Sequence, residues 1–265
     1  GGKQDGDYMI VEADHPVIVQ MATRSNWQHD WAPSDGKSSR GESFFVWAPP
    51  SSGSDNDVNV YAYADDTVVT VEDVTQTPTT AAGKTQVDLS QPRILLRTTL
   101  SAGDDLNVTK GLGIDILVPG HTYWIRATKA VTVQYGHLGS TAGLNQARDG
   151  GGFVPSENGT STGELFYFAI PHNPGRASEK ELRLVSYDAA AQVTLYGRQG
   201  SGPWVQLLQQ TLGQHEHLDL VGASSTAFRQ AELYKLEVTS GKRVTVFAAN
   251  WLETPMSIYE VHLGS

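Results

Sequence analysis

The 265-residue sequence contains no cysteine, which excludes disulfides, thiolate metal sites and a cysteine nucleophile. It also lacks any run of Lys and Arg, and its formal net charge is -10. Proteins that bind nucleic acid neutralise phosphates with clustered basic residues, so a nucleic-acid partner is not expected. No stretch reaches the roughly 18 apolar residues of a membrane helix. Membrane insertion is therefore not expected either.

Helical periodicity is also scarce, and even the best candidate, residues 224–236, is expected to form only a short turn. What the sequence does contain is a succession of runs of about six residues, rich in Val, Thr, Tyr and Phe. Gly, Pro, Asn, Asp or Ser bound each run; examples are residues 43–48, 58–64 and 165–170. This pattern predicts an all-β protein.

The sequence also repeats itself. A strand that opens with an aromatic residue, a polar turn and a Val-x-Val strand occur three times, at residues 7–20, 121–134 and 233–247. Two further matches keep the same order: residues 41–49 match 163–171, and residues 58–71 match 182–195. Ordered matches at similar spacing are typical of internal duplication. The sequence therefore predicts two tandem antiparallel β-sandwich domains, jelly-roll or immunoglobulin-like, related by duplication.

The boundary between the predicted domains lies at the turn Pro119-Gly120. Residues 1–119 form the first β-sandwich repeat and residues 120–265 the second, which includes a closing hairpin at 233–265. By the same reasoning, residues 121–134 could instead close the first sandwich. The domain boundary would then lie one hairpin further along the chain. Sandwiches that share such strands would pack closely, with little linker between them.

The order of these motifs resembles a known family. The strand pair at 6–19, a long polar loop, the strand at 41–49 and the strand pair at 58–71 are similar to the bacterial relatives of the IgGFc-binding protein N-terminal region. More loosely, they resemble hyalin-like secreted β-sandwich repeats. The resemblance rests on strand patterns and turns and covers most of the chain. It implies an extracellular or cell-surface module for adhesion or structure, and it brings no catalytic residue with it.

Residues 22–41 are predicted to be a long loop, and this loop carries Trp27, His29, Asp30 and Trp31. Three interpretations stay open. The two indoles could cover a sandwich end, with His29 and Asp30 solvated. One indole could be a platform for a sugar ring whose hydroxyls bond to Asp30 and neighbouring amides. Finally, His29 and Asp30 could be metal ligands or an acid–base pair.

Two histidines, His215 and His217, are separated by one residue. The His-x-His spacing is common among metal ligands, so His215 and His217 are candidates for a zinc or copper site. Alternate residues of a strand line one face. The other interpretation is therefore a solvent-exposed polar face, with Leu218 and Leu220 turned inward.

Residues 51–59 are rich in oxygen-bearing side chains, as calcium loops are. The candidate calcium ligands, including two from the following turn, are Asp55, Asn56, Asp57, Asp65 and Asp66. These residue types are also the ones that turns use, so a plain turn is the alternative. The loop at 136–162, which is read as flexible, carries an N-glycosylation signature at Asn158.

The sequence contains no Gly-x-Ser-x-Gly elbow and no phosphate-binding loop. It predicts a non-catalytic extracellular or cell-surface module for adhesion or structure. Its partner would be protein, either neighbouring domains or a second copy of itself. The alternative is a carbohydrate-binding module or carbohydrate-active enzyme that binds a glycan with the Trp27–Trp31 loop. The sequence specifies no cofactor, and calcium is the candidate that it suggests.

Overall fold

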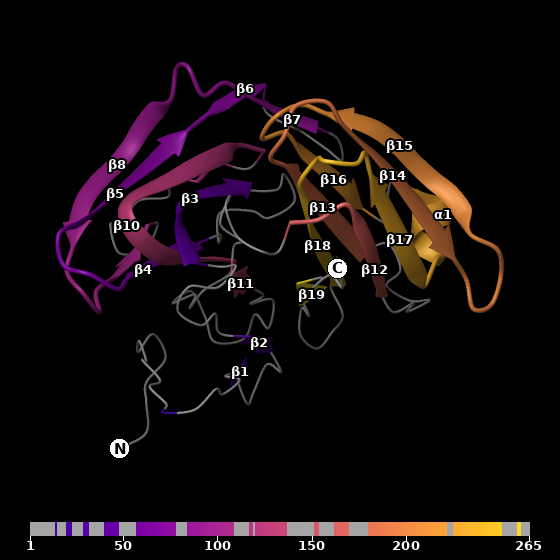
Figure 1. Ribbon diagram of the computed structural model, residues 1–265, viewed down its shortest axis with the longest axis horizontal. Coiled ribbons are helices and arrows are strands. Elements are labelled where there is room, and N and C mark those ends of the chain that lie inside the picture. Colours follow the sequence, from indigo (N-terminus) through magenta and orange to yellow (C-terminus); the bar gives the residue numbers. More distant parts are fainter. Residues whose placement is uncertain are drawn as a thin grey trace.

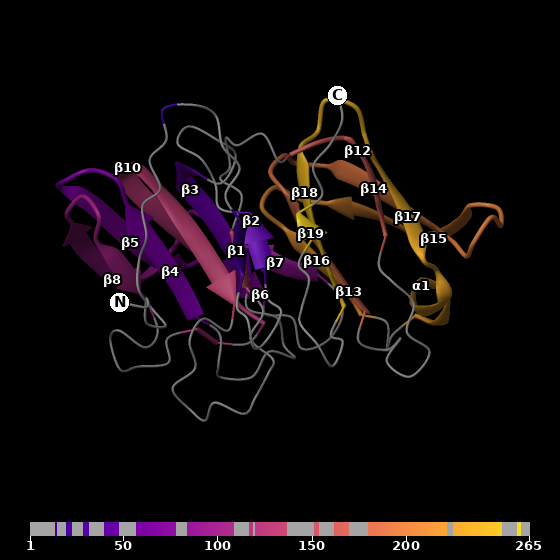
Figure 2. The same cartoon turned by 90° about the horizontal axis from the view of Figure 1, so that it is seen from below.

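The structure is a computed structural model. It describes residues 14, 20–22, 29–31, 40–47, 57–77, 84–108, 117–118, 120–136, 151–153, 162–169, 180–221, 225–250 and 259–260. Every strand pair in this part of the chain is antiparallel, which confirms the prediction of an all-β protein. The strands gather in two halves, residues 40–136 and residues 162–260, that lie side by side (Figures 1 and 2).

The strands that precede residue 154 are β1 (Gln20–Ala22), β2 (His29–Trp31), β3 (Arg40–Trp47), β4 (Asp57–Ala62), β5 (Thr67–Asp73), β6 (Thr75–Thr77), β7 (Lys84–Val87), β8 (Arg93–Leu100), β9 (Asp105–Asn107), β10 (Thr122–Gly136) and β11 (Gly151–Phe153). The elements that follow are β12 (Leu165–Ala169), β13 (Lys180–Ser186), β14 (Ala191–Arg198), β15 (Val205–Leu212), β16 (His217–Val221), α1 (Thr226–Gln230), β17 (Leu233–Val238), β18 (Val244–Asn250) and β19 (Tyr259–Glu260).

In the first half, the fifteen-residue strand β10 organises the sheet. Its residues 122–126 and 131–132 pair with β3 and its residues 123–127 with β5, whereas its residues 131–136 pair with β4. The register shifts between Arg126 and Val131, so one strand serves two groups of partners. Because side chains alternate along a strand, Tyr123 and Ile125 enter the core while Trp124 and Arg126 face away from it.

In the second half, β12, β17, β14 and β15 form one sheet, in that order. A second sheet has the order β19-β18-β13-β16-β7-β6. The core is formed by apolar residues of both sheets, among them Phe166, Leu182, Leu195, Leu236 and Val246. Burying these side chains is the main source of stability for this half.

The helix α1 is a single turn that closes the second core. The Ser225 side chain accepts a hydrogen bond from the Phe228 backbone N–H at 3.2 Å, as an N-cap does. Phe228 is buried in the core, and the chain enters β17 three residues after the helix ends. The prediction of a short turn within residues 224–236 is confirmed. No helix of the described residues is long and apolar enough to cross a membrane.

The two halves pair their strands in the same order. The first part of β10 lies between β3 and β5, as β17 lies between β12 and β14. The hairpin β5–β8 shifts register after Val71↔Leu96, and the hairpin β14–β15 shifts after Leu195↔Leu208. The second part of β10 pairs with β4, as β18 pairs with β13.

Matching turns support the same correspondence. The Gly103 backbone N–H donates to the Ala62 carbonyl at 2.9 Å, and the His215 N–H donates to the Ser186 carbonyl at 2.6 Å. The reciprocal bonds, which return from Ala62 and Ser186 to the turns, are 3.0 and 3.1 Å long. Residues 103 and 215 therefore occupy equivalent positions. By its pairing, β10 lies in the sheet of the first half.

Two short strands lie where the sequence predicted long loops. Residues 29–31 form β2 and pair with β1 in the register Gln20↔Trp31 and Ala22↔His29, so the loop predicted for residues 22–41 is interrupted by a strand. Within residues 136–162, β11 pairs with the end of β10. Strands of three residues are too short for an alternating pattern to reveal them.

Candidate functional site: the junction between the halves

A strand of the first half completes a sheet of the second. β7 pairs with β16 in the register Thr85↔His217 and Lys84↔Leu218, and on its other side it pairs with β6. Figure 1 shows β6 and β7 spanning the space between the halves. The two halves are therefore connected by backbone hydrogen bonds as well as by the covalent chain.

An apolar cluster lies beneath this strand. Phe45 and Val74 from the first half pack with Val185 and Tyr187 from the second, and all four are buried. Phe45 points out of the first-half core because its neighbours Phe44 and Val46 point into it. Phe45 is 2% exposed, covered by Trp124 and Val74 of its own half and by Val185 and Tyr187 of the second.

His215 meets Phe45 across the junction. The imidazole and phenyl rings stack with centroids 4.1 Å apart and an interplanar angle of 15°. His215 has a φ of 59°, a left-handed conformation that costs a non-glycine residue about 1 kcal/mol, and its counterpart Gly103 has a φ of 85°. The stacking contact with Phe45 is the feature that explains a histidine at this strained position.

His217 is buried in the same region. Burial, together with the charges of His215 and Arg183, lowers the pKa of His217 to about 3, so its ring is neutral near pH 7. Its Nδ1 lies 3.5 Å from the Thr122 hydroxyl at the start of β10. The interpretation of His215 and His217 as a solvent-exposed face is wrong, since they are 4% and 2% exposed.

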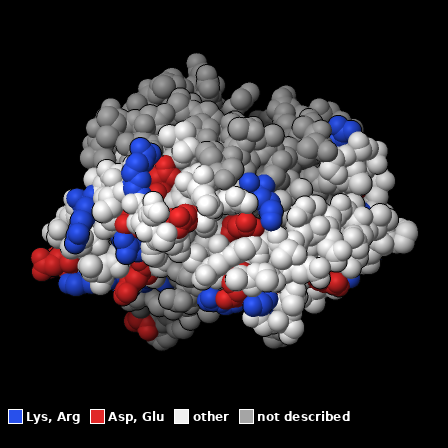
Figure 3. All heavy atoms as spheres, turned by 90° about the horizontal axis from the view of Figure 1, so that it is seen from above, with Lys and Arg blue, Asp and Glu red and all other residues white. Residues whose placement is uncertain are grey.

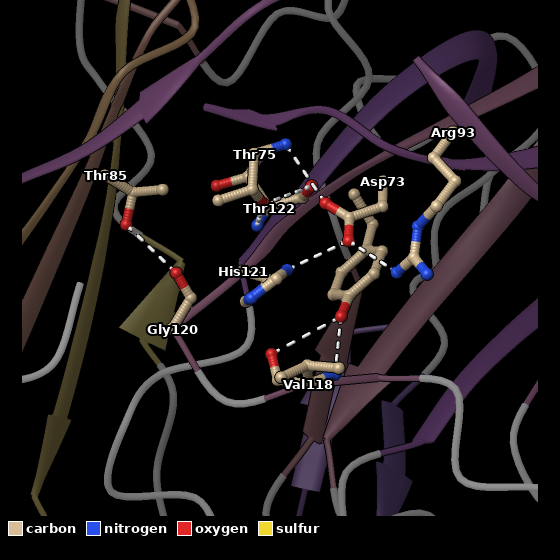
Figure 4. Close-up of polar contacts among 9 residues, drawn as sticks. Asp73, Thr75, Thr85, Arg93, Val118, Gly120, His121 and Thr122 are labelled. Atoms are coloured by element: carbon tan, nitrogen blue, oxygen red, sulfur yellow. Dashed lines mark hydrogen bonds and ion pairs between the residues drawn. The ribbon is translucent and has the colours of Figure 1, made fainter. Parts of the chain in front are cut away.

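Asp73 gathers three partners at the end of β5 (Figure 4). Its carboxylate lies 3.0 Å from Arg93 Nη2 and 2.9 Å from His121 Nδ1, and it accepts the Thr75 N–H at 3.0 Å. Burial acts to raise the pKa of Asp73, but the hydrogen bonds from His121, Thr75 and Arg93 outweigh it and hold the pKa below its ordinary value. Asp73 is therefore an ionised, almost buried anchor.

The hydroxyl of Thr75, next to Asp73, forms hydrogen bonds with the backbone of Thr122. The Thr75 hydroxyl donates to the Thr122 carbonyl at 3.3 Å and accepts the Thr122 N–H at 2.8 Å. A histidine held by a carboxylate suits acid–base catalysis only where it also faces a reacting group. Here the hydroxyl of Thr75 joins the start of β6 to the start of β10, so the described contacts fit a structural role.

One ion pair crosses the junction at its edge. Lys84 Nζ lies 3.1 Å from Glu216 Oε2 and donates to the Thr211 carbonyl at 2.9 Å. The same Glu216 carboxylate accepts the Gly213 N–H at 2.8 Å, which fixes the turn before β16. A partly exposed pair of this kind contributes at most about 1 kcal/mol, so the apolar cluster stabilises the junction more than the ion pair does.

Most of the site residues predicted from the sequence fall outside this junction. Trp27, Asp55, Asn56 and Asn158 lie outside the described residues. His29, Asp30 and Trp31 are described only as the backbone of β2, and Asp57 only as the start of β4. Among the residues that the structure describes, no group of three or more His, Asp or Glu side chains could hold a metal ion.

Asp65 and Asp66, the other calcium candidates, lie in the turn between β4 and β5. The Asp65 carboxylate accepts the Ala102 N–H at 2.9 Å, and its carbonyl accepts Lys129 Nζ. Asp66 has a φ of 54°, a conformation that Asp tolerates better than most residues. These contacts are those of a turn that holds a neighbouring turn in place.

The sequence analysis did not single out Phe45, Asp73 or His121. A signal for Phe45 was present, because the run Phe44-Phe45-Val46 puts apolar side chains on both faces of β3. A strand that is apolar on both faces is expected to be covered on both. Nothing in the sequence places Asp73 beside His121, which is 48 residues away.

No protein-family model matches the chain, and no curated protein matches it.

Proposed function

We propose that this chain is a non-catalytic structural and adhesive module of the cell surface or extracellular space, built from two duplicated β-sandwich domains. The observation that carries the proposal is the junction, in which β7 pairs with β16 over the cluster of Phe45, Val185 and Tyr187. The boundary between the domains then falls after β10, near residue 136, and β6–β7 belongs to both.

The repeated pairings support duplication. Strand order, the position of the register shift in β5–β8 and β14–β15, and the bonds of the turns at Gly103 and His215 all recur. The buried tyrosines Tyr123 and Tyr234 also recur, each bonded to backbone that precedes its strand. Convergence on one hairpin is common, whereas agreement across all of these features favours a shared origin.

The junction supports a structural role because it fixes one domain relative to the other. Modules that set spacing or transmit force need a fixed geometry, which a flexible linker does not give. The resemblance to bacterial relatives of the IgGFc-binding protein N-terminal region points to the same setting. The partner in this proposal is protein. On the side shown in Figure 3, acidic and basic side chains of the described residues are interspersed, which does not favour a nucleic acid.

Three measurements on the purified chain test the proposal. Sedimentation velocity over a range of protein concentrations should reveal self-association, and small-angle scattering should fit one fixed arrangement of the halves. Tryptophan fluorescence titrated with a panel of polysaccharides should stay constant. A chain that remains monomeric throughout, and whose fluorescence responds to a polysaccharide in a way that Trp27→Ala abolishes, would instead be a carbohydrate-binding module.

A further inference from the structure

The second half exposes the sheet face that the first half buries in the junction. Tyr167 on β12 pairs with Lys235, as Phe45 on β3 pairs with Trp124. Phe45 is 2% exposed, with residues of the second half contributing to its cover, whereas Tyr167 is 60% exposed. Among the described residues, no second domain covers the equivalent face of the second half.

We call this face the outer face and define it by Tyr167, Tyr196, Trp204, Lys235 and Glu237. Lys235 Nζ lies 4.4 Å from the Tyr196 ring centroid and 2.7 Å from Glu237 Oε1. Trp204 and Tyr167 meet edge to face with centroids 6.3 Å apart. Aromatic rings around a cation are enriched at protein interfaces. The exposed aliphatic side chain of Leu165, which pairs with Glu237, extends the apolar area of the same face.

The partner surface in the junction is the end of the second half. It presents Val185, Tyr187, His215 and His217, all of them buried there. The matching strand pairs and turns give Tyr61, Tyr63, Gly103 and Asp105 as the counterparts in the first half. We call this second surface the tip. Tyr61 and Tyr63 are partly exposed and Asp105 is exposed, so the tip has surface open to a partner.

Each surface carries charges of both signs: on the outer face Lys235 is paired with Glu237, and at the tip the Arg40 guanidinium lies 4.0 Å from the Tyr63 ring centroid. The outer face contributes Lys235, and Arg198 lies beside it with its guanidinium 4.7 Å from the Trp204 ring centroid. The tip contributes Asp105 together with the exposed Asp104. Glu237 on the face and Lys129 near the tip have the reverse signs and can pair with each other. Complementary charge of this kind fixes the register of an interface and speeds its formation.

We propose that the outer face of one chain binds the tip of a second copy, head to tail. This contact would repeat between chains the packing that joins the two halves within one chain. The inference rests on the duplication in the proposed function. Because face and tip are different surfaces, each added copy exposes a further face, and the contact leads to open rows unless its rotation closes a ring.

The contact between chains should be weaker than the junction. Between β5 and β8 the first half has β6 and β7, which reach across to β16. Between β14 and β15 the second half has only residues 199–204, so no strand extends to the next copy. The outer face then relies on side chains alone, and the association is reversible.

Complementary variants test the proposal in sedimentation velocity. Tyr167→Glu places a negative charge on the outer face, and Asp105→Lys places a positive charge on the tip. Each variant alone should need at least about tenfold more protein to associate than the unaltered chain. Mixed in equal amounts they should associate again, because the intact tip of one fits the intact face of the other. Arg97→Glu, an exposed charge change on β8 outside both surfaces, should associate like the unaltered chain.

Circular dichroism and thermal unfolding of each variant establish that it is folded. The proposal is overturned if folded variants stay monomeric when mixed, or if Asp105→Lys still associates fully, which would indicate a symmetric face-to-face contact. It is also overturned if the unaltered chain stays monomeric while a polysaccharide changes its tryptophan fluorescence and Tyr167→Glu abolishes the change. Association that neither variant affects would overturn this contact and leave the proposed structural role intact.

Discussion

At the scale of single residues, one buried hydroxyl anchors the second half. The Tyr234 hydroxyl contacts the Phe228 carbonyl at 2.7 Å and the Ala231 carbonyl at 2.9 Å, and burial raises its pKa. We expect Tyr234→Phe to lower the free energy of unfolding by about 1–3 kcal/mol, because it leaves buried carbonyls unpaired. Urea unfolding measures the change. Tyr167→Phe, which removes an exposed hydroxyl, should change it by less than about 0.5 kcal/mol. Equal effects of the two variants would contradict this role for Tyr234.

Asp73 acts at the same scale through its charge. Its pKa in the folded protein lies below its ordinary value, so the ionised carboxylate stabilises the fold above about pH 4. That contribution is lost as the pH falls through the lower, folded pKa. We expect Asp73→Asn to lower the free energy of unfolding at pH 7. The variant should also lose less of this free energy than the unaltered chain as the pH falls below about 4. Urea unfolding at each pH measures both effects. Asp105→Asn, which changes an exposed carboxylate, is the matched control. If the stability of Asp73→Asn falls with pH as steeply as that of the unaltered chain, Asp73 does not have this effect.

At the scale of elements, β7 holds the halves together. It lies between β16 and β6, so proline at Thr85 removes a ladder hydrogen bond on one side or the other. We expect Thr85→Pro to lower the thermal midpoint and to raise the radius of gyration in small-angle scattering as the halves loosen. Thr85→Val keeps the branched shape and loses only a 3.5 Å contact to the Gly120 carbonyl, so it should change neither. An unchanged radius in Thr85→Pro would mean that β7 does not hold the halves together.

The elements also differ in how far the sequence could predict them. Alternation made β5 readable, since Thr67, Val69 and Val71 are buried on one face. The sequence suggested separate strands at 123–128 and 131–136, whereas both belong to the continuous β10. The polar Thr128-Lys129 looked like a turn. The chain stays extended there because β3 pairs with β10 on both sides of the register shift, while β5 and β4 each pair on one side. Pairing between distant segments decided this, and local propensity does not report it.

At the scale of the whole molecule, the junction was the least predictable part. Phe45 and His215 are far apart in sequence, as are Asp73 and His121, and each pair meets only through the path of the chain. His-x-His spacing suggested ligands on one strand face, but His215 occupies a left-handed turn position and His217 begins β16. Spacing alone does not reveal a positive φ. The close packing of the halves was expected from shared strands, although the shared strand is β7 rather than the hairpins that the repeat suggested.

This junction should make the two halves unfold together. Phe45 packs against Val185 and Tyr187 and stacks on His215, so Phe45→Ala removes the centre of the contact and should cost about 3 kcal/mol. In scanning calorimetry the unaltered chain should give one cooperative transition, and Phe45→Ala should separate it into two, since each half keeps its own core. Ile94→Ala, which truncates a side chain that is 58% exposed on β8, should leave the single transition in place. A single, unshifted transition in Phe45→Ala would show that the halves are coupled elsewhere. Two transitions in the unaltered chain would show that the junction is too weak to fix one domain on the other.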